Sequence, residues 1–485
     1  MTAASASPST NRWLVLVIAC LAQFMVVLDV TIVNVALPSI QHGLHFSPSS
    51  LQWVVNGYTL IFGGFLLLGG RAADLIGRKR LFSVGVALFS FASLLNGLAQ
   101  SPGMLIAGRA LQGLGAALVS PAALSIITTT FTSSEERTKA LGVWSGIAAG
   151  GGAVGLLLGG VLTDLLSWQW IFFVNVPVGM IALAMAVRFV PESRASTAHR
   201  TFDLAGAATV TGGLVLFVYA IVKAQSFGWG SPRTVAMIAG ALALLAAFAA
   251  IERRSPAPLV RPSIFRIRTL TVADVVMLLV ASGMFSMFFF ASLYVQEILG
   301  YSPLRAGLAF LPVTAGIGIG AAAAQQLIRR LGVRAVAVGG ITIATVGMAL
   351  LTRVPVHGSY AGDLLVGLMP LSIGMGLTFV PITLLGTGNV QPDDAGLASG
   401  LFNTALQVGG ALGWAVLATL AASHTAGLLH GNVGATAHLA ALVSGYHLAF
   451  AGGAIVLGSG AVLLAFGLRR RHVVGIDLAP SPVVT

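Results

Sequence analysis

Charged residues are scarce in this chain. Asp, Glu, Lys and Arg make up 8% of its 485 residues, against about 25% in ordinary soluble domains. Cysteine is scarcer still: Cys20 is the only one, so no disulfide can form within the chain. Hydrophobic residues instead account for 56% of the sequence, and the mean hydropathy is +0.94. This balance excludes a soluble globular domain and predicts an integral membrane protein.

The apolar residues gather in fourteen stretches of about 20 residues, the length that an α-helix needs to cross a bilayer. No stretch shows the alternation of a membrane β-barrel, and the 60 Gly residues suit close helix packing. We therefore predict an all-α integral membrane protein. Its expected spans are 13–37, 52–70, 81–99, 103–127, 139–163, 170–188, 204–223, 233–251, 270–294, 303–328, 334–353, 361–388, 396–422 and 445–468.

Basic residues are distributed unevenly between the loops. Most of the 26 Lys and Arg residues fall at one set of span ends, which predicts that this side is cytoplasmic. Because the number of spans is even, both termini are expected in the cytoplasm, at the inner membrane. The net charge of +12 is therefore interpreted as a topology signal and not as a nucleic-acid surface. The first apolar run lacks a convincing cleavage site and is expected to be a retained span.

Two longer inside loops, about 189–203 and 252–269, divide the spans into groups of six, two and six. Repeated helical bundles facing each other are the usual plan of secondary transporters. The loop between the second and third spans, which contains Gly77, weakly resembles the loop at Gly332 between the corresponding spans of the second group of six. The longest outside loop is expected at about 423–444. The predicted units are an N-terminal bundle 1–196, a two-helix insert 197–262, a C-terminal bundle 263–470 and a cytoplasmic tail 471–485.

Asp29 is an acidic residue inside the first apolar run. A carboxylate in the membrane interior costs about 2.5–3.5 kcal/mol on insertion scales, and burial favours its neutral form. We interpret Asp29 as a proton carrier. The alternative is a structural Asp that stays paired with an Arg and never titrates.

Arg109 lies inside the fourth span, about six residues from its outside end. Asp29 lies about nine residues before Pro38, which is taken as the outside end of the first span. At 1.5 Å per residue both side chains start about 9–14 Å deep, so we predict that they pair, directly or through water. Protonation of Asp29 would then weaken that pair. Asn34 is about 140° further round the helix and cannot face the same partner.

A tight loop joins the second and third spans and contains Gly70, Asp74, Gly77, Arg78 and Lys79. Asp74 can interact with a helix N-terminus and with basic side chains. The loop is therefore predicted to be a conformational latch that holds one face of the cavity shut. The alternative is an ordinary basic inside turn with an incidental acid.

Glycines recur at a spacing of four in the fifth span, at Gly151, Gly155 and Gly159. This spacing predicts a close-packing face for a neighbouring helix. The same region also matches the dinucleotide-binding pattern of glycines, but neither a strand nor a βαβ unit surrounds it, so that motif is rejected.

Soft, aromatic and amide side chains are candidates for the wall of a substrate cavity. The alternative for the Met- and Phe-rich ninth span is a lipid-facing or core stretch. The nine His residues form no ligand cluster in the sequence, so no metal site is predicted, and no nucleophile–base set is present. The cavity candidates are Asn34, Gln112, Met284, Phe288, Asn403 and Gln407.

Taken together, these residues resemble the major facilitator superfamily, and specifically its fourteen-helix multidrug:proton antiporters. The similar stretches are Leu28–Pro38, Gly70–Arg80, Arg109–Gly113, Trp168–Pro177 and Gly396–Gly413. The resemblance implies two six-helix bundles plus two inserted helices, and efflux of amphipathic compounds driven by protons. It also implies that Asp29 couples proton and substrate with help from Arg109, and that Asp74 and Arg78 serve the latch.

Three positions depart from that family pattern. Leu156 stands where a Pro is usual, Gln169 stands where an Arg is usual, and Leu406 replaces a frequent basic residue. The missing Pro removes a site at which the helix would kink. Because few acids lie deep in the spans, neutral or monocationic substrates are expected over dicationic ones.

Our leading hypothesis is therefore a proton-coupled exporter of amphipathic drugs or antibiotics. It is expected to be a monomer in the lipid bilayer that uses no cofactor beyond the proton gradient. One alternative is an exporter or facilitator of a single native metabolite. Another is a receptor or scaffold that kept the fold without transport.

Overall fold

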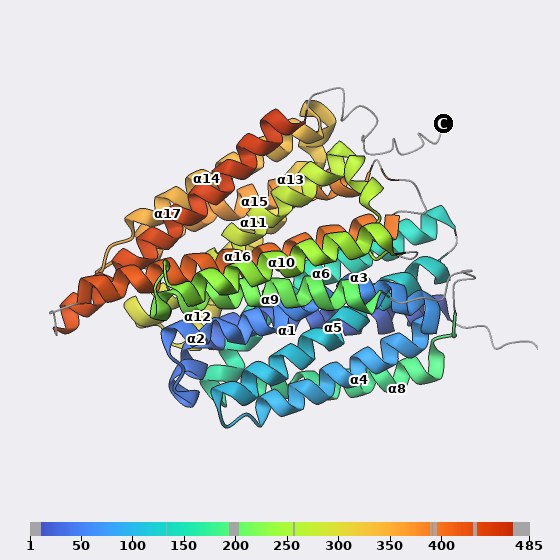
Figure 1. The fold of residues 1–485 in the computed structure, drawn as a ribbon, viewed down its shortest axis with the longest axis horizontal. Coiled ribbons are helices and arrows are strands. Elements are labelled where there is room, and N and C mark those ends of the chain that lie inside the picture. Colours follow the sequence, from blue (N-terminus) through green and yellow to red (C-terminus); the bar gives the residue numbers. More distant parts are fainter. Residues whose placement is uncertain are drawn as a thin grey trace, which may run out of the picture.

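The computed structural model describes residues 11–131, 133–193, 203–255, 258–388, 390, 395–429 and 434–468, with some side chains inside these ranges left out. Every regular element in these ranges is a helix, and none is a strand. The long helices run roughly side by side in two groups, blue to cyan and yellow to red in Figure 1, with a green pair in front. The predicted tail 471–485 lies outside the described residues.

The blue to cyan group is the N-terminal bundle. Several of its helices begin at a side chain that accepts from free N–H groups of the first turn, such as Asn11 and Ser101. Its helices are α1 (Arg12–Leu44), α2 (Pro48–Leu51), α3 (Trp53–Ile76), α4 (Arg78–Gly97), α5 (Pro102–Thr130), α6 (Ser134–Leu165), α7 (Trp170–Phe173) and α8 (Asn175–Phe189).

Two inserted helices and the C-terminal bundle follow. The insert consists of α9 (Leu204–Phe227) and α10 (Pro232–Arg254), and α9 packs on a helix of each bundle. After the short η1 (Pro262–Arg266), the C-terminal bundle holds α11 (Arg268–Leu293), η2 (Tyr294–Ile298), α12 (Pro303–Ala309), α13 (Leu311–Leu331), α14 (Val333–Leu350), η3 (Leu351–Arg353), η4 (Tyr360–Leu364), α15 (Leu365–Thr387), α16 (Ala395–Leu429) and α17 (Ala435–Gly467).

By length and composition, 13 helical segments among the described residues can cross a membrane. They match thirteen of the fourteen predicted spans. The remaining span corresponds to α6, whose described apolar part, Gly150–Leu165, is shorter. The prediction of an all-α, multi-pass membrane protein is confirmed.

The prediction of a long loop at about 423–444 is wrong. Helix α16 continues to Leu429 and α17 already begins at Ala435. The segment is rich in Ala, the residue with the highest helix propensity. The two helix ends also bond each other, since Thr425 Oγ1 donates to the Ala441 carbonyl over 3.2 Å. Hydropathy alone located the most apolar part of each helix and missed these extensions, in which Ser, His, Thr and Gly interrupt the apolar residues.

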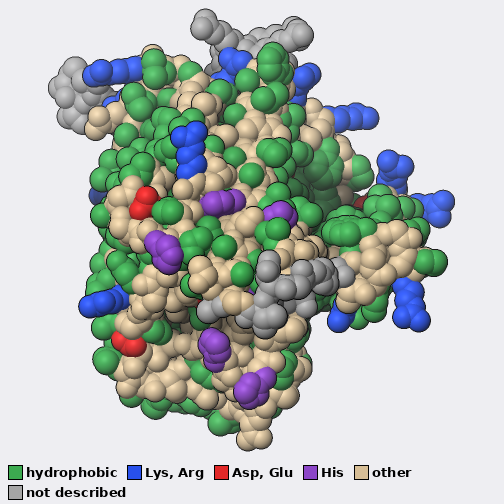
Figure 2. Space-filling view, turned by 90° about the vertical axis from the view of Figure 1, so that its left-hand side faces the viewer, with side chains coloured by type: hydrophobic (Ala, Val, Ile, Leu, Met, Phe, Trp, Pro, Cys, Tyr) green, Lys and Arg blue, Asp and Glu red, His purple; other side chains and the backbone are tan. Residues whose placement is uncertain are grey.

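The two ends of the molecule carry different side chains. One, here called the arginine-rich end, carries the basic residues at the start of α1 and α4 and at the end of α10 and α13. The opposite end, here called the histidine end, faces the viewer in Figure 2, where purple His side chains outnumber red acidic ones. Its described histidines are His42, His45, His357, His424, His438 and His447.

The two bundles share one kind of tight turn. Gly77 connects α3 to α4 with φ 120, and Gly332 connects α13 to α14 with φ 82. Positive φ favours glycine because other residues clash there. The weak echo between these two loops in the sequence thus corresponds to matching turns at the arginine-rich end.

The bundles are joined by hydrogen bonds that lie mostly toward the histidine end. Ser292 Oγ donates to the Asn34 carbonyl over 3.1 Å, and Gln296 Nε2 donates to the Val35 carbonyl over 3.0 Å. Nearer the middle, Thr404 Oγ1 donates to the Gly63 carbonyl. Among the described residues these contacts close the histidine end.

Pro38 explains why the Asn34 carbonyl is available. The sequence predicted that the first span ends at Pro38. Helix α1 instead continues to Leu44. Proline lacks an N–H group, so the carbonyl four residues earlier, on Asn34, has no helical partner. Ser292 supplies the missing donor from the other bundle.

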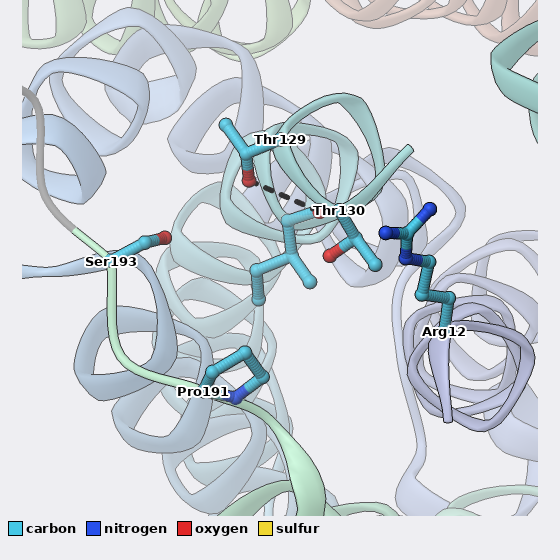
Figure 3. A pocket seen from close by; sticks show the side chains of 6 residues that line it. Arg12, Thr129, Thr130, Pro191 and Ser193 are labelled. Atoms are coloured by element: carbon cyan, nitrogen blue, oxygen red, sulfur yellow. Dashed lines mark hydrogen bonds between the residues drawn. The ribbon is translucent and has the colours of Figure 1, made fainter. Parts of the chain in front are cut away.

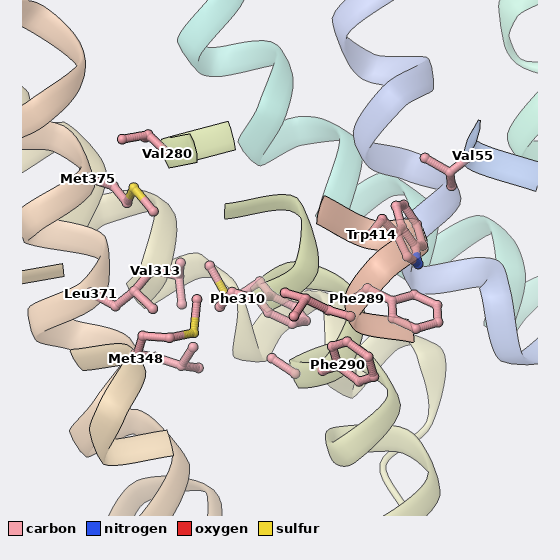
Figure 4. Packing of buried hydrophobic residues seen from close by; sticks show 14 of the residues in the cluster. Val55, Val280, Phe289, Phe290, Phe310, Val313, Met348, Leu371, Met375 and Trp414 are labelled. Atoms are coloured by element: carbon pink, nitrogen blue, oxygen red, sulfur yellow. The ribbon is translucent and has the colours of Figure 1, made fainter. Parts of the chain in front are cut away.

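Two of the four phenylalanines of α11, Phe289 and Phe290, are buried in the core. Phe289 lies against Trp414 with ring centroids 4.6 Å apart, and Phe290 lies against Tyr446 at 5.7 Å. Figure 4 shows Phe289 and Phe290 of α11 near Trp414 of α16. Their side chains are almost fully buried, which fixes α11 against its neighbours.

Candidate functional site

Asp29 and Arg109 form a buried ion pair. The Arg109 guanidinium donates to Asp29 Oδ2 over 2.5 Å, and both side chains are 0% exposed. Asp29 comes from the middle of α1 and Arg109 from the first half of α5. The predicted pairing of these two residues is confirmed.

The other Asp29 oxygen is also satisfied. Oδ1 accepts from Gln112 Nε2 over 2.7 Å and from Asn175 Nδ2 over 3.0 Å. The carboxyl group therefore accepts three hydrogen bonds, one of them from a cation. In this arrangement its charged form is fully compensated, as a buried carboxylate requires.

Gln112 links this pair to α4. Its Oε1 accepts from Arg109 over 2.7 Å and from Asn96 Nδ2 over 2.8 Å, and its Nε2 also contacts Ser93 Oγ over 2.6 Å. Every member of this polar network is buried. A change in the protonation of Asp29 would therefore reach three other helices through hydrogen bonds.

Arg109 is held by the backbone and by aromatic rings as well. Its Nε donates to the Val54 carbonyl of α3 over 2.9 Å. Its guanidinium carbon lies 4.4 Å from the centre of the Tyr58 ring and 5.8 Å from that of Phe172. Such contacts between a cation and an aromatic face are attractive, and more so when desolvated. Arg109 therefore has partners on α3 and α7 in addition to Asp29.

Sequence reasoning missed four members of this site: Tyr58, Ser93, Asn96 and Asn175. A signal existed for two of them, because Ser93 and Asn96 are polar residues one helical turn apart in an apolar span. Asn175 lies in the stretch that resembles the transporter family, yet was not singled out. Nothing in the sequence indicated the position of the Tyr58 ring.

The predicted cavity residues lie in different surroundings. Gln112 is fully buried beside Asp29, so it does not line an open space in this structure. Asn34 is also buried, and its amide donates to the Val30 carbonyl over 3.4 Å. Met284 and Phe288 are half-buried, with Phe288 against Phe310.

The two cavity candidates on α16 differ in exposure. Asn403 is exposed although it lies inside the span, and its amide donates to the Ser399 carbonyl. Gln407 is 5% exposed and lies against Gly63 of α3. Asn403 and Gln407 are one turn apart on the face that meets the N-terminal bundle. Their role in substrate binding stays a prediction.

The predicted latch loop contacts the end of α8 in its own bundle. Arg78 N donates to the Ser193 carbonyl over 3.0 Å, Lys79 Nζ donates to the Val187 carbonyl over 2.8 Å, and Lys79 N donates to Glu192 Oε1 over 3.2 Å. Gly77 lies against the same Glu192 carboxylate, a partner that the sequence did not reveal.

Gly70 and Asp74 also belong to the predicted latch. Gly70 lies near Pro121 of α5, while the side chain of Asp74 lies outside the described residues. The described contacts anchor this loop within one bundle. Its function as a latch stays a prediction.

The glycine face of α6 is confirmed. A Cβ atom at Gly151 would lie 3.3 Å from Val27, one at Gly155 would lie 3.0 Å from the Leu28 carbonyl oxygen, and one at Gly159 would lie 2.6 Å from the Ile32 carbonyl oxygen. The three glycines therefore allow α6 to touch the backbone of α1. This contact supports the helix turn that carries Asp29.

The three residues that depart from the family pattern have different surroundings in the fold. Leu156 is 3% exposed, and its carbonyl meets Gly307 of α12, so α6 contacts the C-terminal bundle there. Gln169 starts the short α7, where its backbone carbonyl accepts from Phe172 N over 3.0 Å. Leu406 is half-buried on α16.

Pockets on the described surface lie away from Asp29. One, at the arginine-rich end, is lined by Arg12, Thr129, Thr130, Pro191 and Ser193 (Figure 3). Another, at the histidine end, is lined by Tyr301, Arg305 and Tyr360. Both are shallow openings between helix ends. Neither reaches the buried pair.

Comparison with known proteins agrees with this architecture. Residues 19–414 match the model of the Major Facilitator Superfamily. The chain belongs to this superfamily. The match runs from the N-terminal bundle through the insert and into α16 of the C-terminal bundle, so this Major Facilitator protein is a multi-pass membrane transporter.

Relatives of this Major Facilitator transporter share most of its length. It is 44% identical to the puromycin resistance protein pur8 of Streptomyces alboniger, over 100% of this chain and 96% of that protein. It is 41% identical to the cephamycin export protein CmcT of Amycolatopsis lactamdurans, over 87% of each.

A solved structure shares its fold. A bacterial homolog of the human lysosomal transporter Spinster, in an inward-facing and unoccupied conformation, superimposes with a TM-score of 0.67. The two chains are 17% identical, and the match covers 98% of this chain and 100% of that chain.

Proposed function

We propose that this transporter is a proton-coupled exporter of amphipathic drugs or antibiotics. The observation that supports this most strongly is the buried Asp29–Arg109 pair at 2.5 Å. A proton that binds Asp29 removes its charge and therefore releases the ionic bond to Arg109. One proton thus changes the contacts of several helices, which is the requirement for coupling.

The orientation of the protein in the membrane follows from the basic residues. Their concentration at one end supports a cytoplasmic arginine-rich end, with both termini inside the cell, at the inner membrane. Each inward proton then provides about 2.3 kcal/mol per 100 mV of membrane potential. Substrate leaves as protons enter, by alternating access of the two bundles. The protein works as a monomer in the bilayer, with no cofactor besides the proton gradient.

The substrate class rests on two different observations. The half-buried Met284 and Phe288 and the amides of Asn403 and Gln407 offer apolar and polar contacts suited to amphipathic compounds. The relatives are named for resistance to puromycin and for export of cephamycin. Compounds of this kind are the first substrates to test.

Substrate-triggered proton release tests the proposal. Everted vesicles carrying the wild type, Asp29→Asn or Glu136→Gln would be exposed to a panel of antibiotics and lipophilic dyes. Glu136 is the matched control, because it is an acid paired with an arginine, Arg12, but at an exposed site. We expect Asp29→Asn to abolish proton release and Glu136→Gln to retain it. Full activity of Asp29→Asn would overturn the assignment of Asp29.

A second candidate is an exporter of one native metabolite. The names of the two relatives favour it, since each specifies a single antibiotic. The same panel separates the two candidates. Proton release by one structural class of compound would support the narrow exporter, whereas release by unrelated compounds would support the broad one.

A further inference from the structure

A second buried acid lies in the C-terminal bundle. Asp274 is 9% exposed, and neither of its carboxyl oxygens has a hydrogen-bond partner among the described residues. Asp29, by contrast, accepts three hydrogen bonds. We propose that Asp274 is a second proton-binding site of this transporter. The proposal rests on the proton-coupled function inferred above and deepens it.

The position of Asp274 on α11 explains its isolation. Leu270, Asp274 and Leu278 follow one another at steps of four and lie on one helical stripe. Leu270 packs with Ala398 of α16, and Leu278 lies against Gly409 of α16. Asp274 therefore lies between two apolar contacts of the α11–α16 interface.

No described charge compensates Asp274 from the helices around it. Helix α15 has no titratable residue, α16 has only His424, and α17 has His438, Tyr446 and His447, all near the histidine end. On α1, Asp29 is committed to Arg109 and His42 lies near the histidine end.

The basic groups nearest in sequence are engaged or exposed. Arg268, six residues before Asp274 on α11, donates from its Nε to the Gly467 carbonyl over 2.7 Å. Arg266 of η1 is exposed. On α10, the Glu252 carboxylate accepts from Val260 N over 3.0 Å, and Arg253 and Arg254 are exposed. None of these side chains donates to Asp274.

Because Asp274 has no described donor or counter-charge, its neutral form is favoured. A carboxylate without donors or a counter-charge is far more costly to bury than a neutral carboxyl group. In this conformation Asp274 therefore holds a proton. Asp29, with its three donors, holds none.

The proton on Asp274 has a short route to water. Asp274 lies about 9 Å along the helix from Arg268, at the arginine-rich end. When α11 moves, a small displacement brings the carboxyl group into contact with water at that end.

The same helix carries the contacts that close the histidine end. Ser292 and Gln296, which donate to α1, follow Asp274 on α11 and η2. Loss of the proton would place a charge between α11 and α16 and favour their separation. Proton binding at Asp274 therefore stabilises the conformation in which the histidine end is closed. Together with Asp29, this gives two protons per cycle.

Proton stoichiometry tests the proposal. In proteoliposomes, the logarithm of substrate accumulation would be measured against an imposed pH difference for the wild type, Asp274→Asn and the exposed control Glu136→Gln. We expect the slope for Asp274→Asn to fall to half of the wild-type slope, with the control unchanged. An equal slope for Asp274→Asn and wild type would overturn the second site. A wild-type slope of zero would instead reject proton coupling itself.

A measurement that needs no transport covers the case of an inactive variant. Infrared spectra of the folded protein separate the band of a protonated carboxyl group from that of a carboxylate. Subtracting the Asp274→Asn spectrum from the wild-type spectrum should isolate a protonated carboxyl band that disappears as the pH is raised. A band that is missing at every pH, or one that never disappears, would contradict an exchangeable proton at Asp274.

Discussion

The two buried acids of this transporter have opposite surroundings. Asp29 in the N-terminal bundle meets a guanidinium and two amides, while Asp274 in the C-terminal bundle meets none of these. Asp29 is 0% exposed and Asp274 is 9% exposed, so the more deeply buried of the two is the one that has hydrogen-bond donors. The hydrogen-bond donors around each acid determine its protonation. The two bundles thus share a fold and differ in the charge that they hold.

The largest effect is expected from breaking the pair in the N-terminal bundle. Arg109→Gln leaves Asp29 buried without its counter-charge, which should lower the free energy of unfolding by about 3–5 kcal/mol. Combining it with Asp29→Asn removes that charge and should restore most of the loss. Denaturant unfolding in detergent measures both. Equal stability of the single and double variants would show that the pair is not coupled.

A smaller loss is expected from filling the α11–α16 interface next to Asp274. A Cβ atom at Gly409 would overlap the backbone of Leu278. Gly409→Leu should therefore reduce the free energy of unfolding by about 1–3 kcal/mol through overpacking. Gly318 is the control, because a Cβ atom there meets nothing within 4 Å. Similar losses for both variants would mean that the interface is looser than described.

Replacing the isolated acid should be almost harmless to stability. Asp274→Leu removes a buried polar group that has no partner among the described residues, so we expect a gain of about 1 kcal/mol in the free energy of unfolding, or no change. Asp29→Leu should instead destabilise the protein, because it leaves Arg109 unpaired. The same unfolding assay compares them. A large loss for Asp274→Leu would reveal a partner that the described residues do not include.

The smallest expected effect concerns the contact between the bundles. Ser292→Ala removes one donor to α1, worth about 1 kcal/mol, which shifts a two-state equilibrium about fivefold toward opening of the histidine end. Spin labels at Leu166 and Leu308, both exposed at that end, would report the change as a longer distance in a Cys20→Ser background. Unchanged distances in Ser292→Ala would argue that other contacts hold the bundles together.

The sequence predicted the fold well for a physical reason. A membrane helix must satisfy its own backbone hydrogen bonds, so the length of an apolar run nearly determines the element. The helix ends around Leu429 and Ala435 escaped because Ser, His, Thr and Gly residues interrupt their alanines and leucines, which lowers the hydropathy without ending the helix. Pro38 was taken as an end because proline usually breaks helices, whereas α1 continues past it.

The site could be predicted only in part. Equal depth along two helices was enough to predict the pairing of Asp29 with Arg109. It was not enough for Asn175 or Tyr58, since the rotation of α8 and α3 about their axes depends on packing. Gln112 illustrates the same limit: its position on α5 suited a cavity, but its amide faces Asp29.

Pro38 has a consequence for how the two bundles tolerate sequence change. Both acceptors near it, at Asn34 and Val35, are backbone carbonyls, so almost any side chain can replace these two residues without removing an acceptor. Only a residue with an N–H group at position 38 would compete for the Asn34 carbonyl. Substitutions at the two buried positions Asn34 and Val35 therefore change the packing around α1 but keep the hydrogen-bond acceptors between the bundles in place.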